Sequence, residues 1–184
     1  MREVLAIRNL RAGYGEAVVI PDLSLVLGEG EVLLRDQYRY QTVLGADAGN
    51  DSTTLLRHTA PFNSNRWVFS GGHEVIYRHQ IPCRRQTAAT VSLNVNYYVG
   101  GSCVVSASRD GRAWVEVGRI RGLASREMAL PSSLFPAEEV YVRLSGSDAA
   151  DPAGDSAPGS FQVDSYGYTA RLEGTGPETV GVRW

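Results

Sequence analysis

From residue 35 onward, hydrophobic and polar residues alternate with a period of two along several stretches of the chain. In the clearest stretch, residues 91–98, the hydrophobic set begins with Val91, Leu93 and Val95. A period of two places one set of side chains on one face of a strand and predicts a half-buried β-strand. Helical periodicity is nearly absent, and turn signals recur about every 8–12 residues. The pattern therefore predicts an all-β fold, an antiparallel β-sandwich of about six to eight short strands.

Residues 103–117, CVVSASRDGRAWVEV, predict a β-hairpin. Asp-Gly between two β-prone runs is a strong hairpin signal, because Gly111 accepts a positive φ without a Cβ clash. We therefore expect Asp110 to be a turn residue. Trp114, followed by Val115, is expected in the core, whereas an exposed ring would serve as a platform for a sugar. The outgoing strand, turn and returning strand are predicted at residues 104–108, 109–112 and 113–117.

The rest of the predicted sandwich lies on both sides of this hairpin. Residues 38–44 alternate in the same way and predict a strand. Residues 161–172 predict the closing strand, with a β-bulge at Gly167. The preceding residues 145–160, SGSDAADPAGDSAPGS, cannot bury enough apolar surface to order themselves, so we expect a long mobile loop. Residues 173–184 are predicted to form a glycine-rich tail.

Residues 1–34 predict two further strands, joined by a glycine-rich turn at residues 13–15 and followed by a second turn at residues 28–30. The phrase NLRAGYGEAVVIPDLSLVLGEGEVL resembles the start of an ABC-transporter ATPase domain. In that family, the aromatic residue at the position of Tyr14 stacks on the adenine ring. The resemblance therefore implies a nucleotide contact through Tyr14.

The phosphate-binding loop of that family does not follow. G-x-x-x-x-G-K-[ST] holds phosphates through backbone N–H groups and a lysine. The nearest run, residues 45–52, has Asn50 in place of the glycine and Asp51 in place of the lysine, and an aspartate repels a triphosphate. We therefore expect no ATP hydrolysis. Residues 1–34 are either an ATPase start joined to an unrelated domain by a gene fusion or a reading-frame artefact, which we favour, or the ordinary first hairpin of the sandwich.

Composition narrows the possible partners. The chain has 184 residues, enough for one hydrophobic core, and its formal net charge of −2 gives no basic footprint for nucleic acid. All 18 basic residues are arginine, which excludes Schiff-base chemistry. No apolar run approaches the ~20 residues that span a bilayer. The charged first residues lack the apolar core of a signal peptide, so we expect no export by that route.

Spacing indicates neither a metal centre nor a catalytic group. Cys83 and Cys103 can form one disulfide between neighbouring strand ends or remain two buried thiols. His73, Glu74 and His79 suggest zinc, but a strand rises about 3.3 Å per residue, which separates the two histidines by roughly 20 Å. The sequence also contains no Ser-His-Asp, Cys-His or G-x-S-x-G arrangement. We therefore expect no metal, no cofactor and no enzymatic activity.

Two motifs in the second half of the chain resemble one superfamily. Residues 108–114, SRDGRAW, have the form S-x-D-G-x-x-W, and residues 134–144, LFPAEEVYVRL, include a YVRL strand. Both resemble discoidin (coagulation-factor C-type) domains and related galactose-binding-like jelly rolls, including family 32 carbohydrate-binding modules. The resemblance covers about residues 100–145. It implies a galactose-binding-like jelly roll with a carbohydrate ligand, in a family that is often extracytoplasmic.

We therefore predict a truncated ATPase-like segment over residues 1–34, a β-sandwich over residues 35–172 and the tail. The first functional hypothesis is a non-catalytic module that binds carbohydrate through loops at one end of the sandwich. Aromatic rings stack on the C–H faces of sugars and arginines donate hydrogen bonds, so the candidate contact residues are Trp67, Tyr97, Tyr98, Arg109 and Arg112. One alternative is an ABC ATP-binding fragment with Tyr14 against the nucleotide. Another is a structural or adhesion domain without a small ligand.

Overall fold

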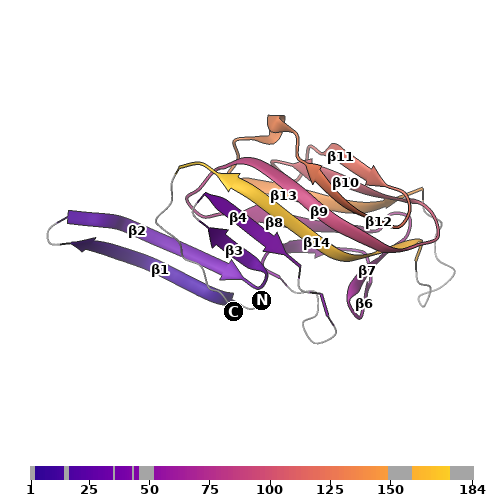
Figure 1. Ribbon diagram of the computed structural model, residues 1–184, viewed down its shortest axis with the longest axis horizontal. Helices are drawn as coiled ribbons and strands as arrows, with labels where there is room; N and C mark the ends of the chain where they lie inside the picture. Colours follow the sequence, from indigo (N-terminus) through magenta and orange to yellow (C-terminus); the bar gives the residue numbers. More distant parts are fainter. Residues whose placement is uncertain are drawn as a thin grey trace.

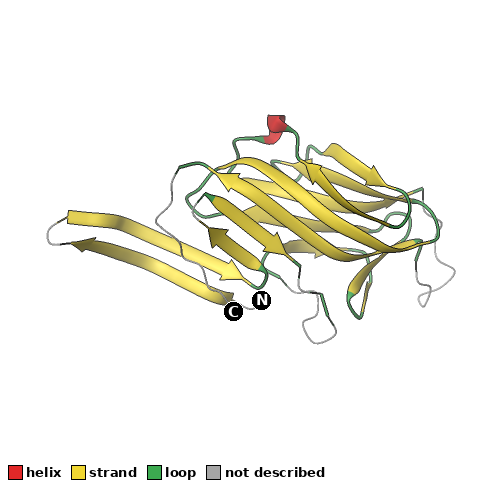
Figure 2. Cartoon of the chain, in the orientation of Figure 1, coloured by secondary structure: helices red, strands yellow, loops and turns green. Residues whose placement is uncertain are grey.

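The computed structural model describes residues 3–14, 17–34, 36–42, 44–45, 52–148 and 159–174. Within these ranges the regular secondary structure is β-strand, apart from one 3-10 turn, η1, at Ser132–Leu134 (Figure 2). Two antiparallel sheets face each other as a sandwich, as the alternation predicts. In Figure 1, β9 and β14 of one sheet lie in front of β8 and β13 of the other. No helix in the described part of the chain is long and apolar enough to cross a membrane.

The sheets have different sizes. The five-stranded sheet has the order β11 (Val115–Ile120), β10 (Ser102–Ser108), β13 (Glu139–Ser147), β8 (Glu74–Gln80) and β5 (Leu55–His58). The seven-stranded sheet has the order β12 (Ala124–Ala129), β9 (Gln86–Tyr98), β14 (Phe161–Leu172), β4 (Gln37–Gln41) and β3 (Glu31–Leu34), with β7 (Arg66–Phe69) on β14 and β6 (Phe62–Asn63) on β7. From β4 to β10 the chain passes from one sheet to the other at almost every connection, as jelly rolls do.

Burial along the strands follows the hydrophobic pattern. In β9, Val91, Leu93 and Val95 are buried, and in β13 the buried set is Val140, Val142 and Leu144. Their neighbours in sequence are more exposed, because successive side chains of a strand point to opposite faces. The predicted strand over residues 91–98 is therefore confirmed, and β14 has the bounds predicted for the closing strand.

Aromatic rings fill the space between the two sheets. Tyr77 of β8 stacks on Tyr166 of β14 with ring centroids 4.1 Å apart. His79 of β8 stacks on Tyr168 of β14 at 3.8 Å, and its Nε2 lies 2.8 Å from the Tyr166 hydroxyl. Such ring pairs add about 0.5–1.5 kcal/mol each beyond the area that they bury. The stack therefore joins the two sheets through β8 and β14.

Trp67 belongs to this core, so its prediction as a ligand contact is wrong. Its side chain is fully buried, and Nε1 donates a hydrogen bond to the Tyr77 hydroxyl at a distance of 3.0 Å. Phe62 packs edge-on against the indole at a centroid distance of 5.2 Å. A ring enclosed on all sides cannot stack on a sugar from solution.

The N-terminal strands form a sheet of their own. β1 (Glu3–Tyr14) pairs with β2 (Ala17–Gly28), which confirms the predicted hairpin, and Tyr14 lies at its tip opposite Ala17. Figure 1 shows this hairpin extending away from the sandwich. β3 pairs with β4, however, so the sandwich begins at Glu31, four residues before the predicted boundary at residue 35.

Several local predictions need correction. β13 continues to Ser147, so the predicted loop 145–160 begins later, and its residues 149–158 lie outside the described ranges. The register of β14 shifts on both sides of Val163 and not at the predicted bulge, Gly167. Gly167 instead lies where an added Cβ would meet Ser92 and Gln41. Cys83 is exposed and Cys103 is buried, and both are free thiols.

Candidate functional site

The outer face of the five-stranded sheet carries a cluster of arginine and tyrosine side chains. Since Val140, Val142 and Leu144 of β13 point inward, Tyr141 and Arg143 point outward. Tyr141 lies between Arg78 of β8 and Ser108 of β10, and Arg143 lies between Ile76 and Ser106 on the same two strands. Arg57 of the edge strand β5 is paired with Ile76. The register thus places three arginines and a tyrosine on one surface.

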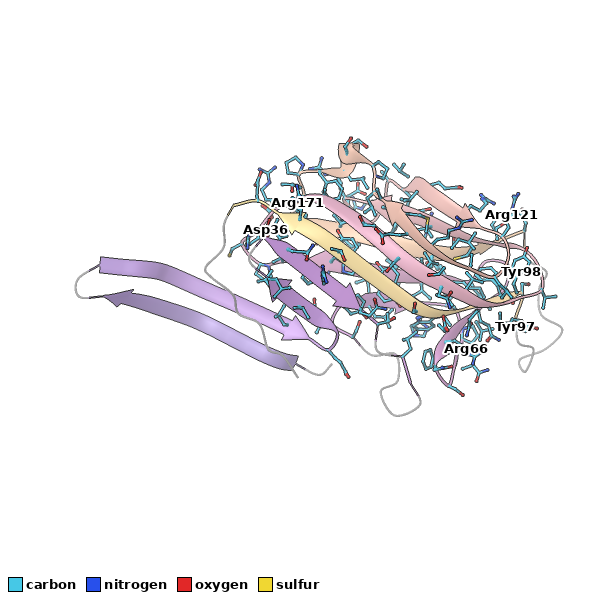
Figure 3. All side chains as sticks on the ribbon, viewed as in Figure 1. Asp36, Arg66, Tyr97, Tyr98, Arg121 and Arg171 are labelled. Atoms are coloured by element: carbon cyan, nitrogen blue, oxygen red, sulfur yellow. The ribbon has the colours of Figure 1, made fainter. Side chains whose placement is uncertain are left out.

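A pocket of about 410 Å³ opens on this face. Its volume lies within the range of small-molecule sites, about 300–1,000 Å³. The hollow lined by Asp36 and Arg171, both labelled in Figure 3, is smaller, at about 230 Å³. The larger pocket is lined by Leu56, Arg57, Ile76, Asp110, Gly111, Arg112, Trp114 and Tyr141.

The turn that follows β10 forms one wall of the pocket, and Asp110 holds it in shape. Oδ1 of Asp110 accepts hydrogen bonds from the backbone N–H groups of Ala113 and Arg112, each at 2.8 Å, and from the Ser108 hydroxyl at 2.9 Å. These hydrogen bonds, led by Ala113 and Arg112, lower the pKa of Asp110 to about 2. Gly111 has φ 68° and rests against the Tyr141 ring. The prediction that Asp110 is a turn residue is confirmed.

Trp114 lies at the end of this turn and not in the core, where it was predicted. β11 begins one residue later, at Val115, so the turn is longer than the sequence pattern suggests. The half-buried indole lines the pocket, and the Arg143 guanidinium carbon lies 4.5 Å from the ring centroid. This distance is typical of a cation–π contact, which holds the indole against the sheet.

A pair of ionic contacts orders the arginines beside the indole. One oxygen of Glu74 lies 3.1 Å from Nη2 of Arg57, and the other lies 4.0 Å from Nη1 of Arg143. The Glu74 backbone N–H donates to the Thr59 hydroxyl over 2.9 Å. Glu74 therefore ties the edge strand to the centre of the sheet and fixes the side of the pocket opposite the turn.

The predicted contact residues do not gather in one place. Arg112 lines the pocket, whereas Arg109, from the same turn, is exposed outside it and donates to the Pro136 carbonyl over 3.1 Å. Tyr97 and Tyr98 are half-buried at the end of β9 in the other sheet, near Arg66 and Arg121 in Figure 3. The Tyr98 hydroxyl donates to the Gly101 carbonyl over 3.0 Å.

Tyr141 and Arg57 line the pocket but are not among the contact residues predicted from the sequence. For Tyr141 a signal was present, because it alternates with the buried valines of EVYVRL and so faces outward. Arg57 carries no such signal, since β5 is short and its pairing with β8 is irregular. Within the described residues, no group of three or more histidine, cysteine or acidic side chains could hold a metal ion.

Comparisons with known proteins name no family. The sequence matches no protein-family model. It also matches no curated protein, so neither the discoidin nor the ABC-transporter resemblance is confirmed. Among solved structures, the chain is similar to a carbohydrate-binding module, CBM36, in complex with calcium and xylotriose. That match has a TM-score of 0.33 and 13% sequence identity, and it covers 73% of this chain and 98% of that chain.

Proposed function

We propose that this protein is a non-catalytic binding module that takes a carbohydrate in the pocket on the five-stranded sheet. The observation that carries the proposal is the lining of that pocket. Two aromatic residues, Trp114 and Tyr141, and two arginines, Arg57 and Arg112, line the same pocket. A pyranose ring has an apolar C–H face and a polar rim. Rings that stack and side chains that donate hydrogen bonds match those two features.

The surroundings of the pocket favour binding over catalysis. Asp110, the carboxylate of the pocket, is held in place by hydrogen bonds from the backbone of the turn to its Oδ1, and the neighbouring Glu74 faces two arginines. Glycoside hydrolysis generally needs two carboxyl groups that are free to face the scissile bond. Trp114 and Arg57 are also held before any ligand arrives, by contacts with Arg143 and Glu74, which reduces the conformational entropy lost on binding.

Replacing Trp114 with alanine is expected to weaken carbohydrate binding by at least about ten-fold, because the variant loses the larger of the two aromatic surfaces. The measurement is isothermal titration of the full chain with a panel of neutral and acidic oligosaccharides. Tyr97→Ala is the matched control, because it removes a half-buried aromatic from the other sheet. Circular dichroism confirms that both variants are folded.

The opposite result would contradict the proposal. If Tyr97→Ala abolished binding while Trp114→Ala retained the affinity of the original chain, the ligand site would lie at the end of β9. If no oligosaccharide of the panel bound to the original chain, the assignment of a carbohydrate ligand would be wrong.

A further inference from the structure

We infer that the pocket selects sugars that carry an anionic group, either a uronate carboxylate or a sulfate ester. This inference rests on the proposed function and names the ligand class of the same site. It follows from the hydrogen-bonding groups that remain available around the pocket once their contacts within the protein are taken into account.

Most of the carboxylate oxygens around the pocket already have partners within the protein. Oδ1 of Asp110 accepts hydrogen bonds from two backbone N–H groups and the Ser108 hydroxyl, which among the described residues leaves Oδ2 as the open acceptor of that carboxylate, while both oxygens of Glu74 face arginines, Arg57 and Arg143. Glu139, the third carboxylate nearby, accepts a hydrogen bond from the Tyr141 hydroxyl over 3.0 Å. A neutral sugar presents hydroxyl groups that must donate as well as accept, and this pocket offers them few free acceptors.

The donors, in contrast, are in surplus. Arg112 is exposed, and within the described part of the chain its guanidinium contacts no carboxylate. Arg57 has one ionic partner and a side chain that is 65% exposed. Nη1 of Arg143, whose guanidinium group lies over the indole, is 4.0 Å from the nearest Glu74 oxygen, beyond ordinary hydrogen-bond length. Guanidinium groups bind carboxylates and sulfates through two parallel hydrogen bonds, so this surplus favours an anionic ligand.

The local charge supports the same conclusion. The pocket and its immediate contacts bring together four arginines, Arg57, Arg78, Arg112 and Arg143, against three carboxylates, although the chain as a whole has a net charge of −2. An anion is attracted by the positive potential at this site, even though the net charge of the whole protein is negative.

The test compares galactose-type oligosaccharides with and without an anionic group. Calorimetric titration of the full chain uses oligogalacturonate, sulfated galacto-oligosaccharide and neutral galacto-oligosaccharide. We expect at least one charged sugar to bind about ten-fold or more tightly than the neutral one, since hydrogen bonds to charged groups are the stronger class. The preferred charged sugar identifies the source of the anionic group.

Two arginine variants then locate the effect. Arg112→Ala is expected to remove most of the preference for the charged sugar. Arg109→Ala changes the net charge by the same amount in the same turn, but Arg109 does not line the pocket, so that variant should retain the preference. Equal losses in both variants would overturn the inference, because the preference would then be a long-range charge effect.

The remaining outcomes separate the inference from the proposed function. If neutral and charged sugars bound equally and Trp114→Ala weakened both, the carbohydrate site would stand and the anionic preference would be wrong. If none of the three sugars bound while a neutral oligosaccharide of the wider panel did, the anionic preference would be wrong and the carbohydrate site would stand. If no oligosaccharide bound at all, both would be wrong.

Discussion

Replacing Trp67 with alanine is expected to destabilise the sandwich by about 3–5 kcal/mol, the usual cost of removing a fully buried tryptophan. The indole is enclosed between the sheets, and its Nε1–H is bonded to the Tyr77 hydroxyl. Alanine would leave a cavity beside Phe62 and would leave that buried hydroxyl without its donor. The free energy of unfolding, measured by urea denaturation at pH 7, shows the loss directly.

Trp114→Ala is the comparison for this prediction, because Trp114 is half-buried on the outer face. We expect a markedly smaller loss of stability from that variant. Trp67→Phe, which retains a ring but removes the N–H group, should fall between the two. An equal loss from Trp67→Ala and Trp114→Ala would show that the two tryptophans contribute alike to the core, contrary to their burial.

Lowering the pH from 7 to 4 is expected to reduce the stability by about 3 kcal/mol through His79 alone. The imidazole is fully buried between Tyr38, Tyr40 and Tyr168, and burial lowers the pKa of His79 to about 3. In the unfolded chain a histidine takes up a proton near its ordinary pKa of about 6.5. Between these two values the unfolded state binds the proton and the folded state does not. Stability is therefore unaffected by His79 above about pH 6.5 and falls steadily as the pH decreases towards 3.

Denaturation of the original chain and of His79→Gln across pH 4–7.5 isolates this contribution. Glutamine does not titrate, and its side chain is a candidate to retain the contact with Tyr166. The variant is expected to be less stable at pH 7, because the ring stack is lost, but to show a flatter dependence on pH. Carboxylates titrate in both proteins and cancel in the difference. Parallel pH profiles would contradict a neutral buried imidazole.

Most of the strands could be predicted from the alternation of hydrophobic and polar residues. The strands over residues 91–98 and 161–172 were predicted correctly, because each strand buries at least one face. Periodicity does not say how deeply a given strand end is covered, and this is why the roles of the two tryptophans were predicted the wrong way round. Both are followed by valine, but the Trp67 indole points between the two sheets and contacts Tyr77 of the facing sheet, whereas Trp114 precedes the first residue of an edge strand.

The candidate site could be predicted only in part. The turn with Asp110 and Arg112 has a recognisable sequence signal, and Arg112 does line the pocket. The opposite side comes from β5, β8 and β13, which are far apart in the sequence and become neighbours through the strand order β10-β13-β8-β5. A contact that depends on strand order has no signature in local spacing.

Mapping by NMR tests the proposed position of the carbohydrate site most directly. Backbone amide resonances of the full chain are followed as the tightest-binding oligosaccharide of the panel is added. We predict that the largest chemical-shift changes cluster on the outer face of the five-stranded sheet, at Arg57, Ile76, Gly111, Arg112, Trp114 and Tyr141. Changes centred instead on Tyr97 and Tyr98, with the pocket residues unaffected, would contradict it.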